Sequence, residues 1–254
     1  MKILILPDAA AVAARAAGIV ARTLQAKPDA VLGLATGGTM QPVYAELVRR
    51  NRAGDLSFAR AVSFNLDEYV SLSRDHPGSY HRAMKTALFA QTDFRPHATH
   101  LPRGDAPDPM AEAEAYEARI TAAGSIDLQL MGIGTNGHIG FNEPGSALTS
   151  QSRVVPLARE TRATNRRYFD SDADVPTLAI TMGIATILAA RACLLLATGT
   201  AKAQAVAAMA MGEIGPACPA SALRLHGDAT VLLDPAAAAL LDPAIVATMD
   251  AAHG

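Results

Sequence analysis

Short apolar segments that each end in glycine or a polar residue recur along this sequence and limit the folds open to it. The clearest, at residues 126–131, leads directly into the glycine-rich stretch 131–145, MGIGTNGHIGFNEPG. A short apolar run before a polar turn is typical of a buried strand. Open α/β sheets bind ligands in such turns, at the carboxyl ends of their strands. The stretch 131–145 is therefore the first candidate for a binding site.

Further apolar runs of the same kind predict strands at 2–6, 30–34, 61–65, 97–103, 192–197, 223–225 and 230–233. Helical patterns lie between them, after Asp8, at 41–50, 80–89, 108–123 and 179–190, from 200 onward, and at the C-terminus. This alternation predicts an α/β fold with a doubly wound, mostly parallel, Rossmann-like sheet flanked by helices. No repeat or linker divides the chain, so residues 1–254 are expected to form a single domain.

The polar stretch 146–176 is weakly periodic and is expected to form a mobile flap over the site. It carries five arginines, of which one or two could reach a bound phosphate. These are Arg153, Arg159, Arg162, Arg166 and Arg167.

Composition and charge narrow the range of partners. Half of the residues are hydrophobic, 18% are charged, and the formal net charge is −2. Acidic and basic residues are mixed along the chain, which argues against a nucleic-acid surface or a polybasic membrane patch. The opening apolar run is too short for a signal peptide, and Arg191 interrupts the best candidate for a membrane span. We expect a cytoplasmic protein with no nucleic-acid or membrane partner.

Two glycine- and threonine-rich turns are candidate anion sites. Residues 34–39, LATGGT, join a predicted strand to a predicted helix, where free N–H groups and the helix dipole favour an anion. The turn matches neither a Walker A loop nor a dinucleotide fingerprint, and a plain turn capped by Thr39 is the alternative.

Residues 198–202, TGTAK, place Lys202 in a first helical turn, where a ligand phosphate would relieve its unfavourable charge. A solvated lysine is the alternative there. Together the two turns favour a phosphorylated small molecule.

Candidate acid–base groups lie beside these turns. Asp67 follows the strand 61–65, and a partly shielded carboxylate there could act as a base. Capping of the next helix is the alternative.

His138 and Glu143 form a second candidate group: they are five residues apart, with Asn136 just ahead of the histidine. An imidazole oriented by a carboxylate can exchange protons near neutral pH. A zinc site is the competing interpretation, but no HExxH or Cys/His cluster supports it, and we predict no metal.

Taken together, these segments resemble the glucosamine-6-phosphate deaminase family, also called glucosamine-6-phosphate isomerase. The matching pieces lie in family order over roughly residues 30 to 235. They are LATGGT at 34–39, FNLDEY at 64–69, HPGSY at 76–80, GIGTNGHIGFNEP at 132–144, TRATNRRYF at 161–169, the turn at Lys202, PAS at 219–221 and LH at 225–226.

The resemblance implies an amino-sugar catabolic reaction in which glucosamine 6-phosphate and water give fructose 6-phosphate and ammonia, without a cofactor. It implies that His138 assists ring opening, with Glu143 and residue 136 as its relay, and that Asp67 moves a proton between C2 and C1. The substrate-binding positions it implies are Thr36, Gly37, Gly38, Thr39, Arg167 and Lys202.

Two positions depart from the family pattern. Many members carry aspartate where this chain has Asn136, and an amide cannot take up a proton as a carboxylate does, so the relay must depend more on Glu143. Val155 stands where allosterically regulated members carry a lysine that binds an acetylated sugar phosphate, although Arg153 matches. We therefore expect no activation by N-acetylglucosamine 6-phosphate, and a monomer or small homo-oligomer.

Three other functions are alternatives to a glucosamine-6-phosphate deaminase. A galactosamine-6-phosphate deaminase differs at one sugar carbon, and no residue separates the two. A 6-phosphogluconolactonase typically follows its histidine with a Ser-Leu-Phe-Pro type of sequence, whereas this chain has Phe-Asn-Glu-Pro at 141–144. A non-catalytic sugar-phosphate sensor domain is disfavoured because no DNA-binding helix pair precedes the first strand.

Overall fold

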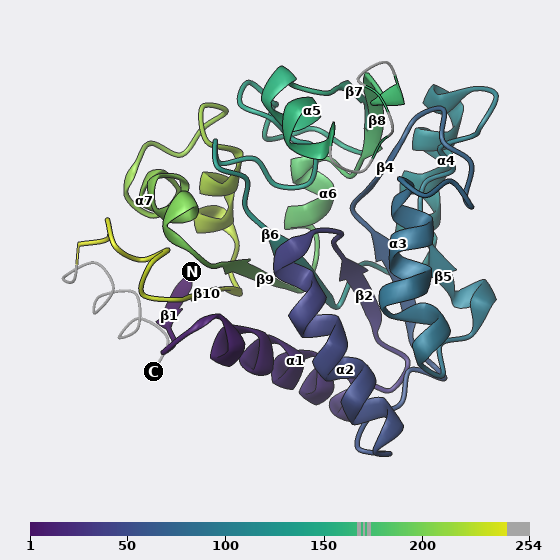
Figure 1. Ribbon diagram of the computed structural model, residues 1–254, viewed down its shortest axis with the longest axis horizontal. Coiled ribbons are helices and arrows are strands. Elements are labelled where there is room, and N and C mark those ends of the chain that lie inside the picture. The colour runs from purple at the N-terminus through teal and green to yellow at the C-terminus, as the bar shows by residue number, and fades with distance from the viewer. Residues whose placement is uncertain (167–168, 170, 172–173, 243–254) are drawn as a thin grey trace.

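A parallel seven-stranded sheet forms the centre of the protein (Figure 1). The computed structural model describes residues 1–166, 169, 171 and 174–242. Within them the strand order is β1-β10-β9-β6-β2-β3-β5, and every pair is parallel. The strands are β1 (Lys2–Ile5), β2 (Val31–Leu34), β3 (Val62–Asn65), β5 (Thr99–His100), β6 (Leu128–Gly132), β9 (Ala192–Ala197) and β10 (Ala229–Leu233). The predicted α/β fold is confirmed.

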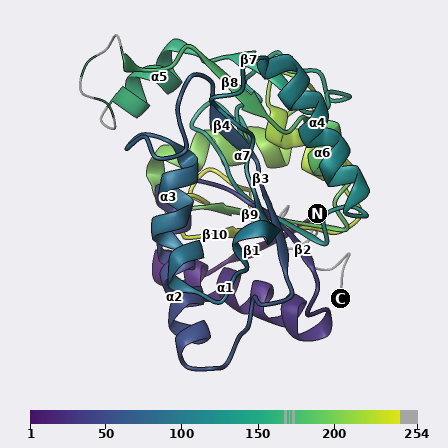
Figure 2. The same cartoon turned by 90° about the vertical axis from the view of Figure 1, so that its right-hand side faces the viewer.

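Helices cover both faces of this sheet. They are α1 (Ala9–Ala26), α2 (Gln41–Arg52), α3 (Tyr80–Ala87), α4 (Pro109–Ala122), α6 (Ile184–Leu188) and α7 (Ala203–Met211). Figure 2 shows α2 and α3 on one side of the sheet and α4 and α6 on the other. Because both faces are covered, the central strands are buried throughout, which is why they are continuous apolar runs in the sequence. Asp8 caps α1 as predicted, accepting the Ala11 N–H at 2.7 Å.

A second, antiparallel sheet of three strands has the order β4-β8-β7. Its strands are β4 (Asp67–Tyr69), β8 (Leu178–Thr181) and β7 (Arg153–Pro156). This corrects the predicted helix at 179–190: residues 179–181 pair with β4, and only Ile184–Leu188 is helical. A short apolar run fits a buried strand and a buried helix equally well, and here the pairing with β4 decides.

Leu66 joins the two sheets. Its N–H bonds to the Leu34 carbonyl of the large sheet at 2.9 Å, and its own carbonyl accepts the Met182 N–H at 2.7 Å, just beyond β8. The chain therefore passes from β3 into β4 without a loop. Asp67 and the residues after it are fixed at the carboxyl edge of the large sheet as a result.

One late prediction is also corrected. Residues 223–225 belong to a 3₁₀ helix, Pro219–Leu225, rather than to a strand. A run of three residues is too short for its periodicity to distinguish the two. Residues 235–240 form turns, and the rest of the predicted C-terminal helix lies outside the described residues. The predicted flap contains β7 and a short helix, α5 (Arg159–Asn165), which Figure 1 shows beside the small sheet. In the described part of the chain no helix is long and apolar enough to cross a membrane.

Gly104 provides a test of how β4 is held. A Cβ at this position would lie 2.1 Å from the Tyr69 carbonyl oxygen and 2.8 Å from that of Leu72, both backbone atoms that cannot swing aside. We expect Gly104→Ala to lower the free energy of unfolding by about 1–3 kcal/mol, measured by chemical denaturation. Gly227→Ala is the matched control, since a Cβ there meets no atom within 4 Å. Equal effects of the two substitutions would contradict this account.

Candidate active site

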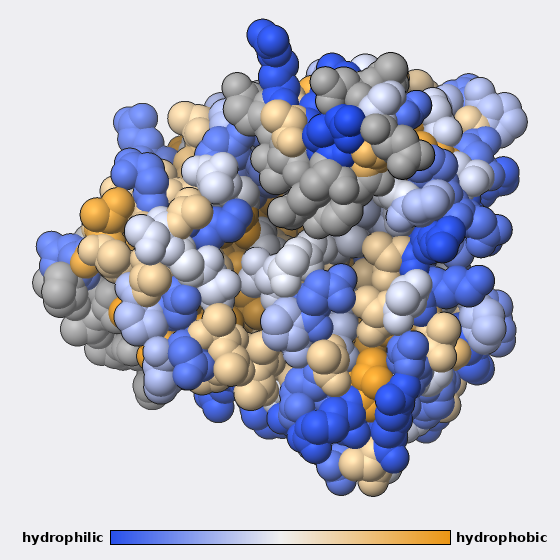
Figure 3. Space-filling view, in the orientation of Figure 1, coloured by the Kyte–Doolittle hydropathy of each residue, from blue (hydrophilic) through white to orange (hydrophobic). Residues whose placement is uncertain are grey.

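One cavity of about 370 Å³ lies at the carboxyl ends of the parallel strands. The surface is hollowed near the middle of the face drawn in Figure 3. The cavity's lining brings together segments that are far apart in the sequence: residues 35–41, Leu66 and Asp67, residues 77–80 and Ala83, Gly132–Asn136 with His138, Gly140 and Phe141, Thr161, and Lys202. Of the ten predicted site residues, eight therefore line a single cavity. Glu143 lies directly behind His138, and Arg167 lies outside the described residues.

The first predicted anion turn is open toward this cavity. Gly37 has a φ of +149°, a conformation that side-chain-bearing residues rarely adopt, and no atom lies within 4 Å of a Cβ built on Gly37 or Gly38. A 3₁₀ turn, Gly38–Met40, then leads into α2, so the start of a helix, which favours an anion, lines the cavity. The hydroxyl oxygen of Thr36 is buried and has no hydrogen-bond partner among the described residues. This turn can therefore receive a ligand with several oxygen atoms.

The second predicted anion turn contributes Lys202, which ends a 3₁₀ turn, Thr200–Lys202, directly before α7. Partial burial lowers the pKa of Lys202. The turn itself is held by Asp234, whose two carboxylate oxygens each lie 3.0 Å from the Gly199 nitrogen and accept its N–H. This role of Asp234 was not predicted from the sequence. The one feature that could have indicated it is the position of Asp234 directly after the last predicted strand.

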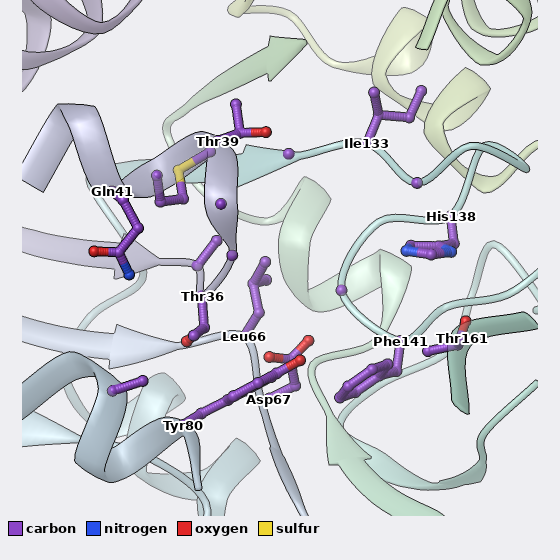
Figure 4. Close-up of a pocket in the computed structure, with 18 of the residues that line it drawn as sticks. Thr36, Thr39, Gln41, Leu66, Asp67, Tyr80, Ile133, His138, Phe141 and Thr161 are labelled. Carbon is purple, nitrogen blue, oxygen red and sulfur yellow. The ribbon is translucent and has the colours of Figure 1, made fainter. Parts of the chain in front are cut away.

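Asp67 stands at the centre of the cavity, between Thr36 and Tyr80 on one side and His138 on the other (Figure 4). Its side chain is nearly buried, with 5% exposed. Burial, reinforced by the neighbouring charge of Glu68, raises the pKa of Asp67 to about 8. A carboxyl group with that pKa can both take up and release a proton near neutral pH.

Glu68, the next residue, turns away into the protein. Its carboxylate accepts the backbone N–H groups of Tyr69, Tyr80 and His81, at 2.9, 3.0 and 2.8 Å. Burial raises the pKa of Glu68 to about 7 against the lowering effect of these three donors. Glu68 and Ser79 together satisfy the first N–H groups of α3, so Asp67 is not the cap of that helix. The local sequence does not distinguish these two adjacent acids, whereas the strand pairing of β4 does.

The glycine-rich loop folds back on itself and presents His138. The Gly134 N–H bonds to the His138 carbonyl at 2.9 Å, and a Cβ on Gly134 would lie 2.2 Å from the His138 ring. Nδ1 of His138 lies 3.4 Å from Oε2 of Glu143, which is close enough for an ion pair but lacks hydrogen-bond alignment. Such contacts often tighten only when substrate is bound.

Asn136 connects both members of this pair. Its Nδ2 donates to Glu143 Oε2 at 2.7 Å, and its Oδ1 accepts the backbone N–H of His138 at 3.2 Å. Burial raises the pKa of Glu143, but contacts with His138, Thr161 and Asn136 outweigh it and lower the value to about 2. Glu143 is therefore ionised at neutral pH, and Asn136 serves as a donor to it where a second carboxylate would repel it.

Tyr80 and Phe141 form the apolar wall beside Asp67. Their rings stack with centroids 5.9 Å apart and an interplanar angle of 11°. The Tyr80 hydroxyl lies 3.2 Å from that of Tyr69. Within the described residues, no group of three or more His, Cys, Asp or Glu side chains could hold a metal ion.

Comparison with known proteins assigns this chain to a family. Residues 8–232 match the protein family described as glucosamine-6-phosphate isomerases/6-phosphogluconolactonase, and the chain belongs to that family.

Individual members of this family differ in how similar they are to this chain. The chain is 53% identical over 238 residues to a glucosamine-6-phosphate deaminase of Rhodopirellula baltica, an alignment that covers 94% of this chain and 95% of the relative. A solved structure of a monomeric glucosamine-6-phosphate deaminase is 47% identical, with a TM-score of 0.92, covering 94% of this chain and all of the other. A 6-phosphogluconolactonase from Trypanosoma cruzi shares the fold at 20% identity and a TM-score of 0.77, with 94% and 96% of the two chains covered.

The raised pKa of Asp67 predicts how stability depends on pH. Between the ordinary value of 3.8 and about 8, the folded protein holds a proton on Asp67 that the unfolded chain has lost, so this group lowers stability as pH rises. We expect Asp67→Asn to raise the melting temperature by a few degrees at pH 8 and by less at pH 5. The exposed Asp55→Asn is the control. A difference between Asp67→Asn and wild type that does not vary with pH would contradict the raised pKa.

Proposed function

We propose that this protein is a glucosamine-6-phosphate deaminase, which converts glucosamine 6-phosphate and water to fructose 6-phosphate and ammonia. The observation that carries this proposal is the placement of Asp67 and His138 in one cavity with two anion-binding turns. An aldose–ketose shift needs these three parts: a base near C1 and C2, a group that opens the ring, and an anchor for the phosphate. The similarity to named deaminases along 94% of the chain supports the same function.

In this proposal the phosphate occupies the end of the cavity formed by the turn at 36–39 and by Lys202. Free N–H groups of the first turn and the lysine ammonium neutralise its charge. The Thr36 hydroxyl, which is buried and has no partner in the described part of the chain, is available to a substrate oxygen. Arg167 completes the proposed set of substrate-binding residues, although it lies outside the described residues.

His138 then assists the opening of the pyranose ring, by moving a proton from the C1 hydroxyl to the ring oxygen. Glu143, held ionised, faces the imidazole and stabilises its charged form while the proton is in transit. Asn136 contributes by orienting Glu143 rather than by carrying a proton.

Asp67 next removes the proton from C2 of the open sugar and delivers it to C1, through an enol-type intermediate. The nitrogen at C2 leaves as ammonia, and the oxygen of water takes its place as the ketone oxygen. The near-complete burial of Asp67 supports this role, because a carboxyl group with a pKa of about 8 is a stronger base than an exposed one.

Several wider expectations belong to the same proposal. The whole chain, 1–254, acts as one domain on a small-molecule sugar phosphate in the cytoplasm, as a monomer or a small homo-oligomer. The similarity to a deaminase that is itself monomeric supports the first of these two states. Galactosamine 6-phosphate remains the alternative substrate. The 6-phosphogluconolactonase similarity supports a shared fold only, given its 20% identity.

Ammonia release from purified protein tests the proposal. We expect turnover of glucosamine 6-phosphate and no measurable hydrolysis of 6-phosphogluconolactone, and galactosamine 6-phosphate assayed in parallel tests the alternative substrate. Asp67→Asn should abolish ammonia release while leaving substrate binding within about tenfold of wild type, because the phosphate anchor is untouched. Lactone hydrolysis without ammonia release would overturn the proposal.

Regulation offers a separate test. Val155 lies in β7 and is buried at 8% exposure, and Arg153 is engaged by Asn142 and Ser146. No second cation from position 155 is available beside Arg153 for an acetylated sugar phosphate. We expect N-acetylglucosamine 6-phosphate to leave the dependence of rate on substrate concentration unchanged. Strong activation in the same ammonia assay would contradict this expectation.

A further inference from the structure

Thr161 is a residue of the cavity that the reaction above does not use. It lies on α5, in the segment expected from sequence to form a flap, and its side chain is buried at 8% exposure. Figure 4 shows it on the same side of the cavity as His138 and Phe141. Its hydroxyl donates to Oε1 of Glu143 at 2.5 Å, the short distance typical of an O–H donor to a carboxylate.

The two oxygens of Glu143 have different partners. Oε2 accepts from Asn136 and faces Nδ1 of His138, whereas Oε1 accepts from Thr161. Among the residues that the structure describes, Thr161 is the one donor to Oε1. Fixing both oxygens fixes the plane of the carboxylate, and this plane determines which oxygen the imidazole meets.

The backbone around Glu143 is held independently of Thr161. Arg153 donates to the Asn142 side-chain oxygen at 2.8 Å and to the Ser146 hydroxyl at 3.2 Å, one residue on either side of the segment 143–145. The Asn142 amide in turn donates to the carbonyls of Ile139 and Met182. Loss of the Thr161 hydroxyl should therefore free the Glu143 carboxylate to rotate without unfolding the loop.

We propose that Thr161 is a positioning residue for ring opening, which aligns Glu143 with His138 and does so only while α5 lies over the cavity. This inference rests on the proposed deaminase function. The flap segment then has a chemical role as well as a covering one: displacement of α5 removes the donor to Oε1, so a fully aligned His138–Glu143 pair requires the closed arrangement.

Two substitutions at this position separate the hydroxyl from the shape of the side chain. Thr161→Val keeps the size and removes the donor; we expect kcat to fall about tenfold and KM to change less than about twofold. Thr161→Ser keeps the donor and should restore at least about half of the wild-type kcat. The exposed Thr149→Val is the matched control and should behave as wild type. An unchanged kcat in Thr161→Val, or a Thr161→Ser variant that is equally impaired, would overturn the proposal.

A double-mutant cycle tests whether Thr161 acts through Glu143. In a Glu143→Ala background, Thr161→Val should lower the residual kcat by less than about twofold, since its partner is gone. A full tenfold loss in that background would show that Thr161 acts elsewhere.

The same cycle measured by chemical denaturation does not depend on turnover. Non-additive effects of Thr161→Val and Glu143→Ala on the free energy of unfolding would support the contact, and additive effects would refute it. Absence of ammonia release by the wild-type protein would instead refute the proposed function, so the two failures can be distinguished.

Discussion

The burial of the Asp67 carboxyl group is the constraint on which the arrangement of this site depends. The chain passes from β3 of the large sheet to β4 of the small one through a single residue, Leu66, which is hydrogen-bonded to both sides. Asp67 is consequently carried to the carboxyl edge of the parallel strands and enclosed there. A buried carboxylate is costly unless it is protonated or paired, and the pKa of Asp67 rises to about 8 accordingly. The stability lost through this burial is the physical basis of its proposed role as a base.

Other acidic residues near Asp67 have a structural role: their carboxylates accept hydrogen bonds that hold the surrounding segments in place. Glu68 accepts the N–H group of Tyr69 in β4 and two N–H groups at the start of α3, and Asp234 holds the turn that carries Lys202. Glu117 of α4 accepts from Ser152, just before β7, and from Thr186 of α6. Each satisfies donors that would otherwise be buried without partners. These hydrogen bonds hold the start of α3 and the turn of Lys202 in place beside the cavity.

The wall that carries His138 is held differently, by partners from three segments. Asn136 belongs to the glycine-rich loop, Thr161 to α5, and Arg153 to β7. Two of these three come from the stretch that the sequence predicts to be a flap. The acid–base pair proposed for ring opening therefore depends on the small sheet and its attached helix as well as on its own loop. This dependence provides a physical link between covering the substrate and aligning His138 with Glu143.

The sequence by itself predicted a mostly parallel sheet flanked by helices, most of its strands, and the turns at the strand ends, because burial on both faces requires continuous apolar runs and open turns require glycine. It also singled out Asp67, His138 and the two anion turns. The small sheet, the strand at 178–181 and the contact of Thr161 with Glu143 were decided only by tertiary structure. A run of four residues carries too little periodicity to distinguish strand from helix, and Thr161 lies 18 residues from Glu143 with no local pattern joining them. Likewise, only the pairing of β4 with β8 decides that Asp67 faces the cavity while Glu68 faces the protein.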